Sequence, residues 1–220
     1  MELSYTIENY LKAIYKLSES NATSVTTNQI ASAQNTKPST ANDMIKKLAD
    51  KKYISYKKYK GVVMTAKGNK QALIIIRRHR LWEVFLVKTL GFKWDEVHHI
   101  AEQMEHVCSD ELINRLDKFL AFPKYDPHGD PIPDSTGKIE KPQLIQLSQL
   151  KKGDTGIVSG VLDHADKFLQ HLEKAELNIG TKIKVSDKSE YDNSFVVALP
   201  KAKSVHVSNV VAINLLIRKA

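Results

Sequence analysis

The sequence predicts a mainly α-helical fold with small β parts, arranged in three consecutive segments. Helical spacing of apolar residues dominates the first half of the chain, interrupted by one basic β-hairpin pattern, and short strand patterns surround a single amphipathic helix near the other end. Five prolines and two glycines between residues 123 and 142 predict a linker. We therefore expect segments of residues 1–72, 73–140 and 141–220.

The first segment has the element order of a winged helix-turn-helix. An amphipathic helix opens the chain, Thr26 or Thr27 would cap a short second helix, and Pro38 suits the first turn of a third. Alternating residues over 53–56 and 62–65 then predict a β-hairpin with a basic tip. Two helices joined by a tight turn and followed by a hairpin are typical of DNA-binding domains.

The second segment contains three predicted helices, and the third segment is predicted to be a small β-barrel. The helices span about residues 67–89, 95–107 and 109–119, and Gly91 suits the end of the first. Short strand patterns around one amphipathic helix, of residues 165–176, are typical of a small barrel. The strand patterns lie at residues 156–158, 182–186 and 195–199.

The formal charge of +8 is unevenly distributed along the chain. Residues 1–72 carry 12 Lys and 5 acidic residues, residues 73–140 carry 9 basic and 12 acidic residues, and residues 141–220 carry 12 basic and 8 acidic residues. The basic first segment indicates a polyanion as partner. The acidic middle segment also contains five of the eight histidines, so we expect a metal site there.

Composition and missing motifs disfavour several classes of protein. No apolar run approaches the roughly 18 residues that span a bilayer, so we expect no membrane association. The single cysteine, Cys108, cannot form an internal disulfide, which fits a cytoplasmic protein. The nine glycines form no phosphate-binding loop, and neither Gly-x-Ser-x-Gly nor His-Glu-x-x-His occurs, so we expect no enzyme.

Polar and basic residues of the third helix and the hairpin form a candidate DNA interface. Side chains at the start of that helix would meet base edges, lysines one turn later would meet phosphates, and the hairpin tip would contact phosphates or the minor groove. A solvated basic face is the alternative, and the helix-turn-helix order favours DNA. The candidate residues are Thr36, Lys37, Pro38, Ser39, Thr40, Asn42, Lys46, Lys47, Lys57, Lys58 and Lys60.

A second group of residues, in the acidic segment, carries metal-binding side chains. Carboxylate and imidazole donors favour manganese or iron over a thiolate zinc site. Ordinary charge pairs on a solvated face are the alternative, but the convergence of several ligand types favours a metal. In the linker, Asp126 and His128 can chelate a metal or can serve as turn residues. The predicted helices present His98, Glu102, Glu105 and His106 along one side, with His79 and Glu83 one turn apart on the preceding helix.

Short motifs along the chain then point to one family. They are ENYLKAIY at 8–15, KPS at 37–39, GVVMTAKG at 61–68, RHRL at 78–81, EHVCSDE at 105–111 and PHGDPIP at 127–133. With these motifs the sequence resembles the DtxR/MntR family of metal-dependent transcriptional repressors over nearly its whole length. The tail, with IG at 179–180 and VSNVVA at 207–212, resembles the FeoA-type barrel of the longer family members.

The resemblance implies a homodimer with two winged helices, a helical dimerisation and metal-binding domain, and a C-terminal Src-homology-3-like barrel. It also implies an effector metal site at Glu102, Glu105 and His106, to which the first helix contributes Asn9. Further ligands form ancillary positions, and His79 serves either site in different members. These ancillary residues are His79, Glu83 and His98. In manganese-responsive three-domain members, a further site draws on the positions of Glu83, Asp126, His128 and Asp163.

Three positions depart from patterns within the family. Manganese regulators usually carry Asp at the position of Asn9. The two-domain type has Glu at the position of Lys12, so Lys12 would oppose a second metal there. Iron-responsive members typically have Cys where this chain has Glu102, and a carboxylate favours the harder Mn²⁺ over Fe²⁺.

We therefore expect a repressor that Mn²⁺ or Fe²⁺ activates and that binds palindromic operators of metal-uptake genes as a homodimer. Without metal, Glu102 and Glu105 would repel each other and leave the first helix loosely held, and a cation would neutralise them. Two alternatives stay open at this point. One is a constitutive DNA-binding protein with a structural metal, and the other is a metal-handling protein or metalloenzyme that does not bind DNA.

Overall fold

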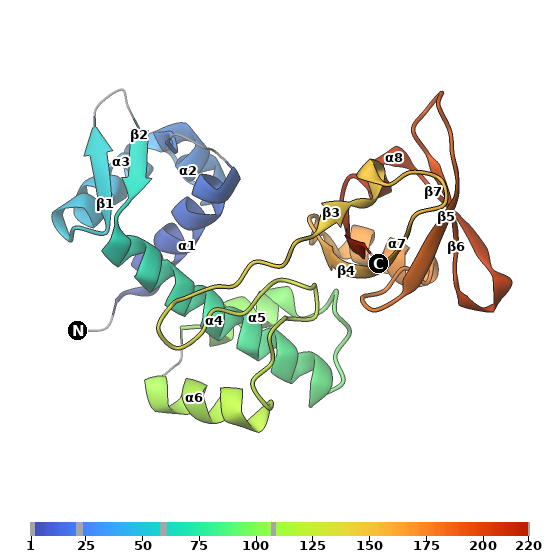
Figure 1. Ribbon diagram of the computed structural model, residues 1–220. Helices are drawn as coiled ribbons and strands as arrows, with labels where there is room; N and C mark the ends of the chain where they lie inside the picture. The colour runs from blue at the N-terminus through green and yellow to red at the C-terminus, as the bar shows by residue number, and fades with distance from the viewer. Residues whose placement is uncertain (1–2, 21–23, 58–60, 107–108, 220) are drawn as a thin grey trace. The chain divides into compact units, whose positions relative to one another are not determined.

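The computed structural model describes residues 3–20, 24–57, 61–106 and 109–219. The contacts within the chain divide it into two units, and the boundary falls inside the long helix α4 (Ala66–Lys88). Among the described helices, none is both long and apolar enough to cross a membrane. The N-terminal unit comprises Met1–His79, Glu102–Arg115 and Ile132–Ile139, and the C-terminal unit comprises Arg80–Ala101, Leu116–Pro131 and Glu140–Ala220 (Figure 1).

The N-terminal unit begins with the predicted winged helix-turn-helix (Figure 1). Thr26 caps the second helix, since its Oγ1 accepts a hydrogen bond from the Gln29 backbone N–H and the Gln29 side chain accepts one from the Thr26 backbone N–H. Pro38 is the first residue of the third helix, where its missing N–H costs nothing. The elements are α1 (Tyr5–Ser20), α2 (Thr27–Ala33), α3 (Pro38–Asp50), β1 (Ile54–Lys57) and β2 (Gly61–Met64).

Apolar residues from all these elements form one core. A bridge between Val25 and Val62 attaches the hairpin β1–β2 to the chain before α2. Both residues are buried, so the hairpin and the helices share their apolar faces. Fully buried members of this core include Leu11, Ile14, Ile30, Ile45 and Leu48. Helix α3 is therefore held by this core on its inner face, and its outer face stays exposed.

The helices after the hairpin differ in one respect from the prediction. Helix α4 has nearly the predicted bounds, and α6 (Asp110–Phe119) begins behind Ser109, whose Oγ accepts a hydrogen bond from the Leu112 N–H. However, α5 spans only His98–Met104, so the predicted helix of residues 95–107 is too long at both ends. Glu105 and His106 lie in a turn after α5, and the predicted arrangement of all four ligands along one helix is wrong.

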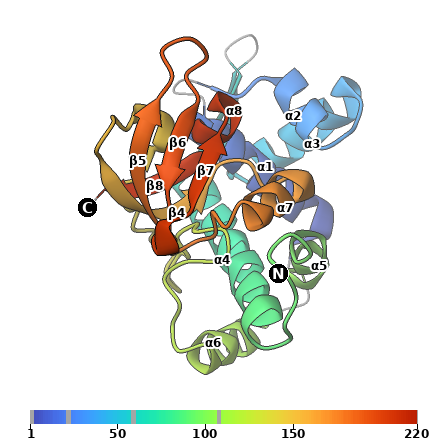
Figure 2. The same ribbon diagram turned by 90° about the vertical axis from the view of Figure 1, so that its right-hand side faces the viewer.

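The C-terminal unit contains a six-stranded antiparallel sheet in the order β3-β8-β4-β5-β6-β7. Its neighbouring strands β5, β6 and β7 lie side by side in Figure 2. Register shifts between Val158 and Gly160 and between Val185 and Asp187 bend the sheet, as small barrels require. Apolar side chains of the sheet and of α7 (Asp166–Lys174) form a second core. The strands are β3 (Ile145–Gln146), β4 (Thr155–Val161), β5 (Lys182–Lys188), β6 (Phe195–Ala198), β7 (Ser204–Val207) and β8 (Leu215–Lys219), with α8 (Asn209–Ala212) before the last.

Gly129, in the linker after Pro127, allows a close approach to β4. Its φ is +88°, and a Cβ atom there would lie 2.1 Å from the Ser159 carbonyl oxygen. The neighbouring His128 carbonyl accepts a hydrogen bond from the Val161 N–H at 3.2 Å. The glycine therefore lets the linker lie directly on the strand, which fixes the position of His128.

We expect Gly129→Ala to lower the free energy of unfolding by about 2–4 kcal/mol, because strain at positive φ adds to a steric clash with backbone. Thermal or urea unfolding measures the change. Gly153→Ala is the matched control, since its φ is +93° and nothing lies within 4 Å of its Cβ position. That variant should lose only about 1 kcal/mol. Equal losses in both variants would contradict the close approach at Gly129.

Candidate metal centre and nucleic-acid interface

Glu105 is the central carboxylate of the first candidate metal site, which lies in the N-terminal unit. The residue is fully buried. Its Oε1 lies 2.7 Å from Lys12 Nζ, and its Oε2 lies 2.7 Å from His79 Nδ1. Burial alone would raise the pKa of Glu105, but hydrogen bonding by His79 and the charge of Lys12 together lower this pKa below the usual value. The side chain is therefore an anionic oxygen donor at neutral pH.

His106 brings the first helix to the same site. Its Nε2 lies 2.9 Å from Asn9 Oδ1 and 3.5 Å from Glu105 Oε1, and its Nδ1 contacts Glu8 Oε2. A carboxylate that accepts the Nδ1–H of a histidine orients the ring and leaves Nε2 for a metal. Asn9 and Glu8 both lie on α1, so the winged helix and the turn after α5 share this site.

Glu8 was not among the residues expected from the sequence. It is 5% exposed, and it also lies 3.4 Å from the Arg78 guanidinium. The signal was present, because Glu8 directly precedes Asn9 and a metal-ligating histidine usually needs a carboxylate partner. Sequence spacing does not identify which carboxylate of the chain meets a given histidine.

Lys12 occupies the space between the two carboxylates of this site. Its Nζ lies 3.3 Å from Glu102 Oε1 and 2.7 Å from Glu105 Oε1. The expected repulsion between Glu102 and Glu105 is therefore relieved by an ammonium of the chain itself, and the expectation that this pair simply repels without metal is wrong. The ion pairs also tie α1 to the chain around the end of α5.

The donors of the first site suit a divalent metal ion. Glu105, His106 and Asn9 supply a carboxylate, an imidazole and an amide oxygen, the hard and intermediate ligands that Mn²⁺ and Fe²⁺ accept. The ammonium of Lys12 beside Glu102 and Glu105 shows that a cation fits between these carboxylates. His79 also belongs to this group through its 2.7 Å contact with Glu105.

A second candidate site, in the C-terminal unit, consists of Glu83, Asp126 and His128. All three are buried, and one ligand atom of each lies within 4.8 Å of the others. The Nε2 of His128 lies 2.8 Å from the Trp94 carbonyl oxygen, so Nε2–H donates there and Nδ1 faces Glu83 Oε2 at 3.7 Å. His98 Nδ1 lies 3.2 Å from Glu83 Oε1. Glu83 therefore contacts His98 through Oε1 and faces the group of Asp126 and His128 with Oε2.

Asp126 and His128, the two members of the second site that lie in the linker, have strongly shifted pKa values. Burial and the neighbouring Glu83 carboxylate raise the pKa of Asp126 to about 7. Burial by itself would lower the pKa of His128, but the hydrogen bond and charge of Glu83, with the charge of Asp126, raise this pKa to about 9. Both shifts arise because Glu83, Asp126 and His128 lie close together in a buried space. Such shifts are common at metal and catalytic sites.

Other side chains position this second group. Asp126 Oδ1 accepts hydrogen bonds from the backbone N–H groups of His128 and Asp130, while Arg80 Nε lies 3.4 Å from its Oδ2. Asp163 instead uses its Oδ1 to accept the Ala165 N–H before α7, and its role as a ligand stays a prediction.

His164, which the sequence did not single out, lies against His128 with ring centroids 5.0 Å apart. A single histidine after a strand does not indicate from the sequence that it contacts a candidate metal ligand.

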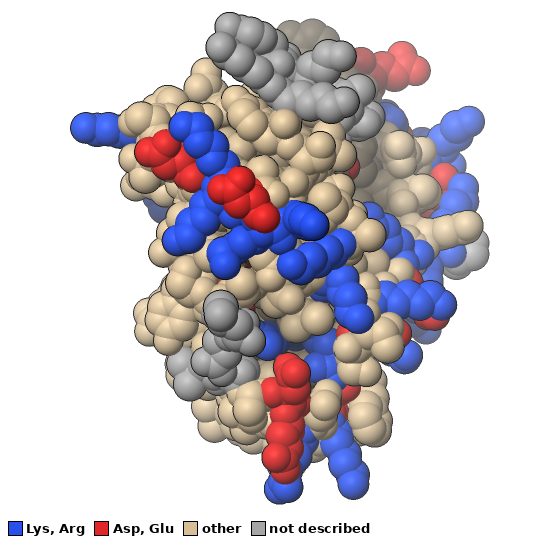
Figure 3. Space-filling model, turned by 90° about the vertical axis from the view of Figure 1, so that its left-hand side faces the viewer, with Lys and Arg blue, Asp and Glu red and all other residues tan. Residues whose placement is uncertain are grey.

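The candidate DNA interface is exposed along the start and outer face of α3. Lys37, Ser39, Thr40, Lys46 and Lys47 are exposed, and Lys and Arg side chains gather on the face shown in Figure 3. The predicted Thr36, Pro38 and Asn42 belong to the same turn and helix, with Thr36 and Asn42 half-buried. Lys57 ends β1, whereas Lys58 and Lys60 lie outside the described residues.

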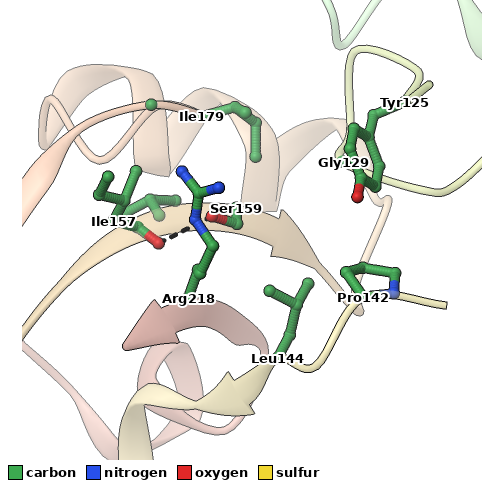
Figure 4. Close-up of a pocket in the computed structure, with 10 residues that line it drawn as sticks. Tyr125, Gly129, Pro142, Leu144, Ile157, Ser159, Ile179 and Arg218 are labelled. Carbon is green, nitrogen blue, oxygen red and sulfur yellow. Dashed lines mark hydrogen bonds between the residues drawn. The ribbon is translucent and has the colours of Figure 1, made fainter. Parts of the chain in front are cut away.

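A cavity of about 190 Å³ lies between part of the linker and the sheet within the C-terminal unit, next to the close approach at Gly129 (Figure 4). Tyr125 and Pro142 line it from the linker side, and Leu144, Ile157 and Arg218 line it from the sheet side. Its lining contains no carboxylate, histidine or cysteine side chain. The cavity therefore offers neither a third metal site nor a general acid–base pair, and both candidate metal sites lie elsewhere.

Three family models match successive parts of the chain. Residues 2–62 match the iron dependent repressor N-terminal DNA binding domain, residues 65–134 match the iron dependent repressor metal binding and dimerisation domain, and residues 145–219 match the FeoA domain. The chain is also similar to the iron-dependent repressor IdeR of Mycobacterium leprae, with 30% identity over 69% of each chain.

Solved structures extend this similarity to the whole fold. A manganese-dependent transcriptional repressor in complex with manganese is 34% identical, with a TM-score of 0.89 over 97% of this chain and 99% of the other. A segment of 75 residues, 34% of this chain, is 51% identical to a "Probable metal transport system membrane protein" of Chlamydia trachomatis, and that segment is only 17% of that protein.

Proposed function

Because the chain belongs to the family of iron- and manganese-dependent transcriptional repressors, we propose that it is a homodimeric repressor that Mn²⁺ or Fe²⁺ activates in the cytoplasm. Its residues 1–72 bind DNA, residues 73–140 bind metal and dimerise, and residues 141–220 form the FeoA-type domain. It acts as a regulator of metal-uptake genes rather than as an enzyme.

One observation carries this proposal, namely that the DNA-binding helix bundle and the first metal site share α1. Asn9 on α1 lies 2.9 Å from His106, which follows α5 and is next to the buried Glu105. A bound divalent cation supplies positive charge among these donors. The side chains of α1 would then be held against the turn after α5, which fixes the orientation of α3 toward DNA. A preference of 1.4 kcal/mol for that arrangement changes its population ratio about tenfold.

Exposed apolar side chains support the proposed dimer. Leu90, Phe119 and Phe122 are each more than half exposed, and all three belong to the C-terminal unit. Phe119 also lies against Phe85, with ring centroids 6.3 Å apart, so the end of α6 and helix α4 share an apolar contact beside this exposed ring. Phe119 is the last residue of α6, within the part of the chain matched by the dimerisation domain model.

The second site takes a further cation, and its affinity should increase with pH. Because the pKa of His128 is raised to about 9 and that of Asp126 to about 7, both groups carry protons at or below neutral pH that a cation must displace. Affinity should rise about tenfold per pH unit between about 7 and 9, and more steeply below about 7.

Mn²⁺ titrations of Glu105→Gln protein at several pH values measure this dependence on the second site alone. His128→Ala in the same background should remove the binding. An affinity that does not change between pH 6.5 and 8.5 would count against His128 and Asp126 as ligands.

The proposed function is tested by DNA binding at fixed salt. We would measure fluorescence anisotropy of a labelled palindromic duplex with full-length protein in chelator, in Mn²⁺ and in anaerobic Fe²⁺. Binding that requires a metal supports the repressor, and the ion that acts at the lower free concentration is the effector. We expect this ion to be Mn²⁺, because Glu102 and Glu105 are oxygen donors.

The same measurement distinguishes the other candidate functions. Equal binding in chelator would show a constitutive DNA-binding protein whose metal sites are structural. No binding under any condition, with metal bound, would favour a metal-handling protein.

A further inference from the structure

The side chain of Lys12 enters the first metal site from α1. Its ammonium forms ion pairs with Glu105 at 2.7 Å and Glu102 at 3.3 Å, and the side chain is only 8% exposed. Lysine is almost never this buried unless it is paired. Here its partners are the same carboxylates that the proposed function assigns to the effector ion. The Lys12 ammonium and the effector ion would therefore bind the same oxygen atoms.

We propose that Lys12 is a tethered competitor of the effector ion, and that it raises the metal concentration at which the repressor becomes active. This inference rests on the proposed role of Glu105 as a metal ligand. A divalent cation bound at Glu105 Oε1 would lie within a few ångströms of Nζ, where two positive charges repel strongly because little water screens them. Metal binding therefore requires Lys12 to leave its carboxylate partners.

The chemistry of lysine allows this exchange. Its charge is at the end of a flexible four-carbon stem with rotatable bonds, so the ammonium can move while α1 keeps its position. The ion pairs with Glu102 and Glu105 are lost when it moves, and this loss is subtracted from the affinity for the ion. A neutral side chain at position 12 has no such pairs to lose.

A purely structural role for Lys12 predicts a different result. In that case Lys12 would stabilise the fold and hold Glu105 in place, and its replacement would leave metal affinity unchanged or weaken it. Competition predicts tighter metal binding by a variant whose folded state is less stable without metal. The two roles therefore differ in the sign of the change in metal affinity.

The test is a Mn²⁺ titration of full-length Lys12→Gln protein, in which electron paramagnetic resonance counts the free ion. We expect at least tenfold tighter binding than in the wild type at the Glu105-dependent site. We also expect a lower melting temperature in chelator and a larger increase on addition of Mn²⁺. Lys16→Gln is the matched control, because Lys16 is exposed on the same helix one turn later. Its affinity should stay within twofold of the wild type.

A second variant keeps the test valid if Lys12→Gln fails to fold. Lys12→Met keeps an unbranched side chain of similar length without the charge, and circular dichroism confirms which variants fold. Unchanged or weaker Mn²⁺ affinity in a folded Lys12 variant would refute the competition while leaving the proposed function intact. A wild-type protein whose Mn²⁺ binding does not depend on Glu105 would overturn the proposed function itself, and the inference with it.

Discussion

Replacing Glu105 with glutamine is expected to reduce metal-stimulated DNA affinity at least 100-fold. The side chain is fully buried, and its two oxygens face Lys12 and His79 at 2.7 Å. Glutamine has almost the same shape but no charge, so it loses the strongest oxygen donor of the first site. Without that donor, a cation no longer links His106 to Asn9 on α1. The measurement is anisotropy of the operator duplex at saturating Mn²⁺ and in chelator.

Two further variants make this result interpretable. Glu111→Gln is the control, because Glu111 is exposed on α6 and pairs with Arg115 one turn later. Glu105→Gln also removes the nearer of the two carboxylate partners of the buried Lys12 and leaves Glu102 at 3.3 Å, so the fold can lose up to about 3 kcal/mol. His106→Gln removes a different ligand, while Glu8 keeps its ion pair with Arg78, and it should show the same loss of metal response. Metal-stimulated binding that persists in both folded variants would exclude the first site as the effector site.

The winged helix-turn-helix could be predicted from the sequence because its signals are local. Thr26 and Gln29 form a capping box, Pro38 marks a helix start, and glycine follows the basic hairpin tip at Gly61. The short strands β3, β7 and β8 could not be predicted, because pairing partners stabilise them. β8, for example, pairs with both β3 and β4.

The candidate metal ligands could be named from the sequence, but their grouping in space could not. Periodicity placed His98 and Glu105 on one helix face, whereas α5 ends at Met104. His98 contacts Glu83, and Glu105 contacts Lys12 and His79. These contacts join residues up to 93 positions apart in the sequence, so only the folded chain shows which candidate donors lie next to one another.

The second large effect is expected from replacing both Lys46 and Lys47 with glutamine. Both lysines are exposed on α3, one turn beyond the residues at its start that would meet base edges. A homodimer presents four such charges to the phosphates. The slope of log affinity against log salt concentration is negative, and each lost phosphate contact reduces its magnitude by about 0.9. The salt dependence should therefore become shallower by up to about 3.6. Affinity at low salt should fall about 100-fold on every DNA sequence.

A matched double variant separates phosphate contact from net charge. Lys182→Gln with Lys184→Gln removes the same charge from exposed positions on β5. This control should keep nearly the wild-type salt slope, since long-range attraction is screened within about 10 Å at 0.1 M salt. A wild-type slope in the Lys46 and Lys47 variant would remove that part of α3 from the interface. The α3 variant should also keep the full Mn²⁺-induced rise in melting temperature. Loss of DNA affinity with an intact metal response would then assign these two lysines to DNA contact, whereas Glu105→Gln should lose the metal response itself.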